Sequence, residues 1–449
     1  MRAGTSIFII CFALLALGGC AYFFPPLFMV WVLTLLAALP FVFGDFIMLR
    51  FFTPTLSINR EMSASLTIGI SASVRLTIAR NAKGIAFGTI NVFDIYDDHF
   101  DCDELPLSIP YPKEGSLSVE YRVLPAERGD WEFSACEVLI DSPFQFWRRK
   151  IRYAVKTRGR TYPVFSGITS GTDIRSNHEL SGEKRVRKRG IGLEFESLRD
   201  WQEGDSVRAI DWRATSRKRQ AIVRDYVEEQ DQQILIILDS GYRLHRLVNG
   251  EDTGTSGIML TQFDAALNAA LLLAYFALKH GDSVATGVFG NTDRWLPPKK
   301  GMSALPHIIN ALYDVKSASV PSSIFSALEN TLARLRRRTF IICISNFREE
   351  DEEELSRILP LLGRRHLLLM VSLCEDEAGA LSNRNLSNSP DTHDDDILLS
   401  EAASNYIAQR KKLYKKWEHL GLLTLDTSAA NLSAKLINSF LAVKRQGLL

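Results

Sequence analysis

The sequence has few cysteines and no pattern that would hold a metal ion or a disulfide framework. Its 449 residues include six cysteines, and none of them stands in a CxxC pair or a Cys/His cluster. This usage argues against a zinc site and fits a reducing compartment. The sequence also lacks a P-loop, a GxGxxG fingerprint and a nucleophile elbow. We therefore expect no cofactor, no catalytic residue and no enzymatic activity.

A charge excess is also missing. The 53 lysines and arginines nearly balance the 52 aspartates and glutamates, which leaves a net charge of +1. A basic run at Lys184–Arg189 has no interleaved aromatic residue, so we expect no nucleic-acid partner. A solvated loop is the first interpretation of this run, and contact with membrane lipid is the second. The length alone predicts two or three globular units.

Two long apolar runs occupy residues 1–50. Thr5–Phe24 and Leu27–Gly44 carry no charged residue, and Pro25-Pro26 separates them. Each run is long enough to cross a hydrocarbon core of about 30 Å as a helix. Because lipid cannot hydrogen-bond a free backbone, both runs should be helical and broken at the prolines. The sequence predicts a transmembrane helical hairpin.

The charges around this hairpin predict its orientation. Arg2 precedes the first run, Arg50 and Arg60 follow the second, and the turn between the runs has no lysine or arginine. Positive flanks remain in the cytoplasm, so we expect a multi-pass protein of the bacterial inner membrane with soluble domains facing the cytoplasm. Leu17-Gly18-Gly19-Cys20 also resembles a lipoprotein processing box, and lipidation of Cys20 stays an alternative. The second span would anchor the chain without the lipid.

Residues 51–165 alternate in polarity. Val119, Tyr121 and Val123 alternate with Glu120 and Arg122, as a strand with one buried face requires. Short runs of this kind between polar turns predict a β-rich, sandwich-like domain. We expect it to be a packing or docking module.

Residues 231–449 change to an alternation of apolar strands and helices. The expected strands are Ile234–Leu238, Ser283–Phe289, Thr339–Ser345, His366–Ser372 and Leu422–Leu425. The expected helices are Phe263–Leu278, Met302–Tyr313, Ile324–Arg334, Ser400–Leu420 and Leu432–Val443, with an acidic helix start at Glu349–Glu354. This order predicts a mostly parallel sheet with helices on both faces. Residues 375–396 are rich in Asp, Asn and Ser and predict a mobile insertion.

Residues 166–230 contain a dense signature. It runs from Gly190 to Trp212 and continues at Arg224-Asp225-Tyr226, and its most distinctive members are Glu194, Phe195, Arg199, Trp201, Gly204, Asp205, Arg208, Asp211 and Trp212. This pattern resembles the domain-of-unknown-function 58 family (DUF58). The resemblance implies paired N-terminal spans, a β region and a von Willebrand factor type A-like, Rossmann-like α/β domain. It also implies a partnership with MoxR-type AAA+ ATPases.

The signature has two physical interpretations. Asp205 is expected to cap a short helix on which Arg208, Asp211 and Trp212 share one face. These residues would then form either an ion-pair network that clamps the segment onto the sheet or a docking surface for the ATPase.

Type A domains often hold Mg²⁺ through a DxSxS turn. The resemblance implies that the corresponding turn follows the expected strand Ile234–Leu238. Here the turn is Asp239-Ser240-Gly241-Tyr242-Arg243, so glycine and arginine replace both motif serines. A later strand ends at Ser345-Asn346 where an aspartate would serve. The remaining oxygens are too few for six ligands, and Asp239 is expected to pair with Arg243. We interpret Asp239, Ser240, Ser345 and Asn346 as a degenerate site without metal.

These observations predict a multidomain, membrane-anchored adaptor protein that works with a MoxR-type AAA+ ATPase in the assembly or maturation of membrane-associated complexes. The alternative is a metal-dependent ligand-binding or hydrolytic type A-like domain.

Overall fold

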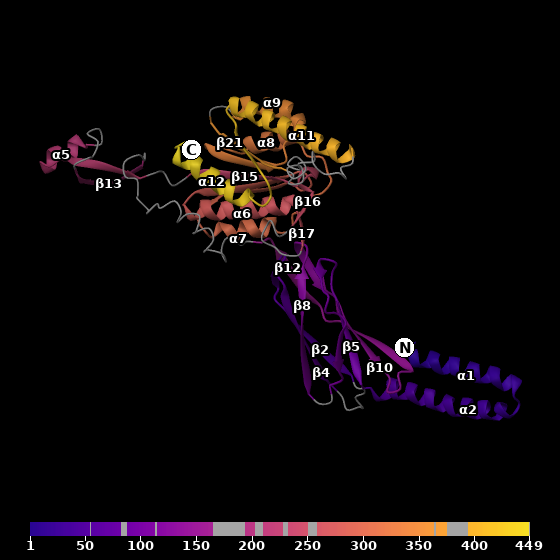
Figure 1. Ribbon diagram of the computed structural model, residues 1–449. Coiled ribbons are helices and arrows are strands. Elements are labelled where there is room, and N and C mark those ends of the chain that lie inside the picture. Colours follow the sequence, from indigo (N-terminus) through magenta and orange to yellow (C-terminus); the bar gives the residue numbers. More distant parts are fainter. Residues whose placement is uncertain are drawn as a thin grey trace. The chain divides into compact units, whose positions relative to one another are not determined.

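The computed structural model describes residues 1–53, 55–81, 88–112, 115–164, 194–202, 210–227, 232–249, 258–362, 365–374 and 394–448. The chain divides into two compact units, Met1–Tyr162 and Pro163–Leu449. Figure 1 shows the helices and strands of each unit. The basic run at Lys184–Arg189 lies outside the described residues.

The first unit begins with two apolar helices. Helix α1 spans Thr5–Phe23 and α2 spans Pro26–Ile47, followed by the short π-helix η1 at Met48–Phe52. Both are long and apolar enough to cross a membrane, and they meet at the predicted proline break. They contact each other where the Trp31 indole N–H donates to the Leu14 carbonyl at 2.9 Å. The predicted pair of apolar helices is confirmed.

The remainder of this unit is built from short, mostly antiparallel strands. They are β1 (Arg2–Ala3), β2 (Leu56–Glu61), β3 (Ser65–Thr67), β4 (Ala72–Arg80), β5 (Thr89–Ile95), β6 (Phe100–Asp101), β7 (Leu107–Pro110), β8 (Ser116–Pro125), β9 (Gly129–Phe133), β10 (Ala135–Asp141), β11 (Trp147–Tyr153) and β12 (Thr157–Tyr162). Sheets of order β1-β11-β10-β5-β7 and β2-β4-β8-β6 share one apolar core, and β3-β12-β9 forms a third sheet. In β8, Tyr121 and Val123 face that core, as their alternation with exposed polar residues predicts.

Arg60 lies in this core and not at the membrane. Its guanidinium is buried against the buried carboxylate of Asp94, with Nε 2.8 Å from Oδ2. It also donates to the Val155 carbonyl at 2.6 Å, and the Tyr121 hydroxyl donates to Asp94 at 2.6 Å. Burial, together with the neighbouring Asp94, raises the pKa of Tyr121. In the folded sandwich the charge of Arg60 is therefore paired with Asp94, and its place among the charges that flank the second run in sequence stays a prediction.

The second unit contains a six-stranded sheet of order β19-β18-β15-β20-β21-β22. Its strands are β15 (Gln233–Asp239), β18 (Ser283–Phe289), β19 (Arg294–Lys300), β20 (Thr339–Ser345), β21 (Leu367–Leu373) and β22 (Leu423–Thr427). All neighbours are parallel except the edge strand β19, which is antiparallel to β18. A small hairpin is formed by β16 (Leu247–Asn249) and β17 (Met259–Thr261).

Helices cover both faces of this sheet, as Figure 1 shows. Helices α6 (Gln262–Lys279), α7 (Ala304–Leu312) and α12 (Leu432–Arg445) contribute to one core, and α8 (Ile324–Leu332), α9 (Glu352–Leu362) and α11 (Asp394–His419) contribute to the other. Along β15, Ile234 and Ile236 enter the first core while Leu235 and Ile237 enter the second. A strand buried on both faces needs a continuous apolar run, which explains this sequence.

The signature segment forms its own hairpin. Strand β13 (Glu194–Asp200) pairs antiparallel with β14 (Ile222–Val227), and α5 (Trp212–Lys218) lies between them in sequence. Ile210 bridges to Val223, and Asp211 has extended backbone. The prediction that Asp211 and Trp212 share one helical face is therefore wrong, because Asp211 is extended and α5 starts only at Trp212, while Asp205 and Arg208 lie outside the described residues. Residues 375–393 of the predicted insertion lie outside the described residues, and 394–396 already belong to α11.

Candidate functional site at the carboxyl edge of the parallel sheet

The carboxyl ends of β15 and β20 bring the four predicted degenerate-site residues to one edge. The two strands are parallel neighbours, so Asp239-Ser240 and Ser345-Asn346 end side by side. All four residues are buried. Binding sites of open parallel sheets form at this edge, so these residues are the candidate site.

Asp239 accepts three hydrogen bonds within the protein. Its Oδ2 accepts from the hydroxyl of Ser345 at 2.6 Å and from that of Ser322 at 3.1 Å, and its Oδ1 accepts from the Gly241 backbone N–H at 2.8 Å. The Arg243 Nε lies 4.0 Å from Oδ2. Most of the acceptor capacity of the carboxylate is therefore occupied within the protein.

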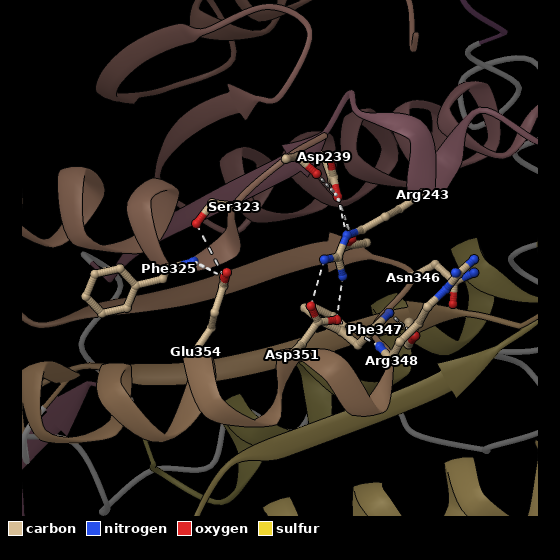
Figure 2. A network of polar contacts seen from close by, with 12 residues as sticks. Asp239, Arg243, Ser323, Phe325, Asn346, Phe347, Arg348, Asp351 and Glu354 are labelled. Atoms are coloured by element: carbon tan, nitrogen blue, oxygen red, sulfur yellow. Dashed lines mark hydrogen bonds and ion pairs between the residues drawn. The ribbon is translucent and has the colours of Figure 1, made fainter. Parts of the chain in front are cut away.

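Arg243 pairs chiefly with Asp351, as Figure 2 shows. The guanidinium comes from the short helix η3 (Tyr242–Leu244), and the carboxylate comes from η5 (Glu349–Asp351) at the start of α9. Two parallel bonds join them, one of them 2.7 Å from Nη2 to Oδ1, and the Arg348 backbone N–H donates to Asp351 at 2.8 Å. Burial opposes the charged form of Arg243, but Asp351 outweighs it and the pKa of the guanidinium is raised. The expected pairing with Asp239 is present as a long ion pair of 4.0 Å, and the bidentate partner Asp351 was not expected.

The space beside Gly241 is too small for the serine side chain of a metal-binding turn. A Cβ added there would lie 2.7 Å from the Ser322 hydroxyl oxygen and 2.9 Å from the Val320 carbonyl oxygen. The neighbouring loop therefore occupies the space that a serine side chain would need, and the Ser322 hydroxyl already donates to Asp239. The turn is fitted to glycine and to an internal hydrogen bond.

The other two predicted residues serve internal contacts as well. The Ser240 hydroxyl donates to the Phe289 carbonyl at 2.8 Å, which joins β15 to β18. The Asn346 side-chain oxygen accepts from Nη1 of Arg410 at 2.8 Å, and Arg410 also donates to Ser372 and to the Asp426 carboxylate. Arg410 is buried, and its bonds connect the ends of β20, β21 and β22 to α11.

The donor set does not suit a metal ion. Magnesium takes oxygen ligands in a near-octahedral arrangement, and a guanidinium beside Asp239 places positive charge where the ion would lie. Among the described residues, no group of three or more His, Cys, Asp or Glu side chains could hold a metal. The edge can supply buried ion pairs and hydrogen bonds, which fix the shape of its surface loops.

Four partners in this site were missed by the sequence analysis: Ser322, Asp351, Arg410 and Asp426. Asp351 lies 108 residues from Arg243 in sequence, and no local pattern predicts that pairing. Its position in the run Glu349–Glu354 suggested only a favourable interaction with a helix dipole.

Four signature residues have described side chains: Arg199, Trp201, Asp211 and Trp212. Asp211 caps α5 by accepting from the backbone N–H groups of Arg213 and Ala214 at 2.9 and 3.0 Å. Trp201 and Trp212 expose 40% and 67% of their surface. Arg199 is half-buried on β13 and donates to the Asp200 carbonyl at 3.2 Å.

The remaining signature residues are described in part or not at all. Glu194 and Phe195 pair through their backbone with Val227 and Tyr226 of β14. Gly204, Asp205 and Arg208 lie outside the described residues.

Comparison with known proteins gives one family match. The model of the family described as protein of unknown function DUF58 matches residues 197–410, which contain most of the hairpin and most of the parallel sheet. This match supports the resemblance carried by the signature. No curated protein matches the chain.

Among solved structures, the chain is similar to the conserved hypothetical protein BatB from Bacteroides thetaiotaomicron, with 11% identity, 48% of this chain and 99% of that chain covered, and a TM-score of 0.29. An aerotolerance-related membrane protein from Bacteroides fragilis gives 15% identity, 46% and 97% coverage and a TM-score of 0.26. An uncharacterized membrane spanning protein from Vibrio fischeri gives 12%, 47%, 98% and 0.18. With TM-scores below 0.5, these likenesses establish neither a fold nor a function for the chain.

Proposed function

We propose that the chain is a membrane-anchored, non-enzymatic adaptor whose partner is a MoxR-type AAA+ ATPase. The two N-terminal helices are its anchor in the bacterial inner membrane, and both soluble parts face the cytoplasm. The family resemblance suggests the ATPase and a role in assembly or maturation of membrane-associated complexes. The parallel sheet with helices on both faces is consistent with the type A-like domain that the same resemblance implies.

The bidentate pair of Arg243 with Asp351 is the observation that carries this proposal. This ion pair lies at the carboxyl edge of the sheet, where Asp239 also accepts hydrogen bonds from Ser345, Ser322 and Gly241. A metal-dependent hydrolytic or ligand-binding domain would need those oxygens for the ion. The described part of this edge therefore favours the non-enzymatic interpretation over a metal-dependent domain.

The exposed tryptophans of the signature supply the docking surface in this proposal. Trp212 and Trp201 are exposed, and Leu198 on β13 exposes 47% of its surface. Large apolar side chains held in water are costly, and tryptophan is enriched among residues that dominate protein interfaces. Asp211 has a different role, because its carboxylate caps the helix that presents Trp212.

Affinity capture of the detergent-solubilised protein tests this function. The wild type should retain an AAA+ ATPase of the MoxR type, and Trp212→Ala should lose it while its thermal unfolding stays unchanged. Leu420→Ala is the matched control, since Leu420 is 50% exposed at the end of α11 and lies outside the signature. Capture of no AAA+ ATPase by the wild type would contradict the partnership. Equal capture by the wild type and both variants would show that Trp212 is not part of the docking surface.

A further inference from the structure

The sandwich carries a row of cations at the end from which the apolar helices leave. Strand β11 contains Arg148, Arg149 and Lys150 in succession, and Arg2 of β1 is paired in register with Arg148. Arg50 follows α2 within η1 and is exposed. These cations come from three separate segments of sequence and are brought together only by the fold.

Two of these cations point outward from their acidic partners. Arg148 pairs with Asp141 at 2.7 Å and Lys150 pairs with Glu137 at 2.5 Å. The two basic side chains are 45% and 52% exposed, whereas the two acids are only 22% and 15% exposed. An ion pair of this kind is weak in water, so its outward cation remains free to meet a second anion.

Short, direct connections hold this end of the sandwich at the helices. Only residues 53–55 separate η1 from β2, a distance of about 10 Å even when fully extended. Asp45 near the end of α2 is buried and accepts from the Ser142 hydroxyl, and the Trp147 indole N–H donates to the Val42 carbonyl at 3.0 Å. The row of cations therefore lies at the level where the second helix ends.

Aromatic side chains accompany the cations. Phe51, Phe52 and Phe144 expose 71%, 49% and 47% of their surface. The Phe144 ring lies 4.4 Å from the ring of Phe41 on α2, centroid to centroid. Apolar rings beside basic side chains are the combination that interfacial segments place at the boundary between headgroups and acyl chains.

We propose that this basal surface, defined as Arg2, Arg50, Phe51, Phe144, Arg148 and Lys150, binds anionic phospholipid headgroups of the bilayer that holds the hairpin. The proposal rests on the membrane anchoring proposed above and adds a lipid preference to it. Lipid phosphates are negatively charged and can pair with these basic side chains. The adjoining helices place the headgroups of the bilayer close to the basal surface. Each lysine or arginine near an anionic bilayer surface adds to this attraction.

Lipid retention measures the preference directly. The full-length protein is reconstituted into nanodiscs of equimolar phosphatidylglycerol and phosphatidylcholine and extracted in mild detergent, and the retained lipids are quantified by mass spectrometry. The wild type should retain phosphatidylglycerol in preference. Arg148→Gln/Lys150→Gln should reduce that enrichment by roughly fivefold for each cation removed.

The control removes two exposed, ion-paired cations from the other end of the sandwich. Arg158 and Arg160 of β12 pair with Glu132 and Asp130, and Arg158→Gln/Arg160→Gln should retain lipid as the wild type does. Equal enrichment in both double variants, or none in an inserted wild type, would overturn the lipid preference and leave the anchored adaptor intact. A wild type that does not insert into nanodiscs would overturn the anchoring itself.

Discussion

At the scale of single residues, Arg243 and Asp351 form a buried ion pair that joins the turn after β15 to the start of α9. Removing Arg243 would leave Asp351 and, at 4.0 Å, Asp239 without their cation. Breaking a buried pair on one side costs about 3–5 kcal/mol, whereas an exposed pair contributes about 0.2–1 kcal/mol. The chemistry of this edge therefore depends on a residue that a metal-binding turn would not contain.

We predict that Arg243→Ala lowers the free energy of unfolding of the second unit by about 3–5 kcal/mol. Arg357→Ala is the matched control, because Arg357 forms an exposed pair with Glu353 on α9 and should cost under about 1 kcal/mol. Denaturant unfolding of the detergent-solubilised protein measures both. Similar midpoints for the two variants would show that the Arg243 pair is not a buried structural one.

The same edge gives a second prediction, on metal binding. Magnesium should leave the melting temperature of the wild type unchanged, because the oxygens of Asp239 already accept from Ser345, Ser322 and Gly241. An ion present at 100 times its Kd would stabilise the fold by about 2.7 kcal/mol. Such a shift in the wild type, absent from Asp239→Asn, would favour the metal-dependent alternative. Without magnesium, Asp239→Asn should itself cost about 1–3 kcal/mol through lost hydrogen bonding.

At the scale of elements, the junction between the hairpin and the sandwich depends on close backbone approach. The Gly4 N–H donates to the Phe146 carbonyl at 2.7 Å, just before α1 begins. A Cβ at Gly4 would lie 2.0 Å from the Gln145 carbonyl oxygen, so any larger residue must push the loop away. The loop that binds Asp45 therefore also holds the start of α1.

We predict that Gly4→Val lowers the melting temperature of the sandwich, with an overpacking cost of about 1–3 kcal/mol. Gly19→Ala within α1 is the control, since no atom lies within 4 Å of an added Cβ there. Thermal unfolding in detergent, followed by circular dichroism in the β-sheet region, compares the two. An unchanged melting curve for Gly4→Val would show that the loop yields without cost.

The elements also show which patterns a sequence can reveal. Strands β18 and β20 have the predicted bounds, and in β20 the apolar run Phe340–Ile344 is unbroken, as a strand buried on both faces requires. Strand β19 was not predicted, since it contains Pro297-Pro298 and two lysines. Proline cannot donate to a ladder and is tolerated on edge strands, and β19 is an edge strand. The helix expected after Asp205 begins outside the described residues, and the structure shows a further helix, α5, which Asp211 caps.

The candidate site could be located from the sequence but its chemistry could not be completed. The end of an apolar strand at Asp239 and the replaced serines pointed to the correct edge. The partner of Arg243 is separated from it by 108 residues, and Arg410 reaches Asn346 from a helix 64 residues later. Side chains so far apart in sequence are brought together by the fold, so their pairing can be recognised only when the order of the strands in the sheet is known.

At the scale of the whole molecule, the orientation of the chain in the membrane decides which partners it can meet. An AAA+ ATPase requires cytoplasmic ATP, so both soluble units must face the cytoplasm for the proposed partnership. The cations of Arg2, Arg50 and β11 lie where the two helices leave the sandwich, and the hairpin tip at Phe24–Pro26 has none. Arg2, Arg50 and Arg60 flank the two runs closely in sequence, which is the asymmetry that predicts cytoplasmic ends.

A topology reporter tests the central claim most directly. A reporter that is active only in the periplasm, fused after Leu449, should be silent, and one that is active only in the cytoplasm should give full signal at the same position. Strong periplasmic activity would contradict the orientation and, with it, the adaptor role beside a cytoplasmic ATPase.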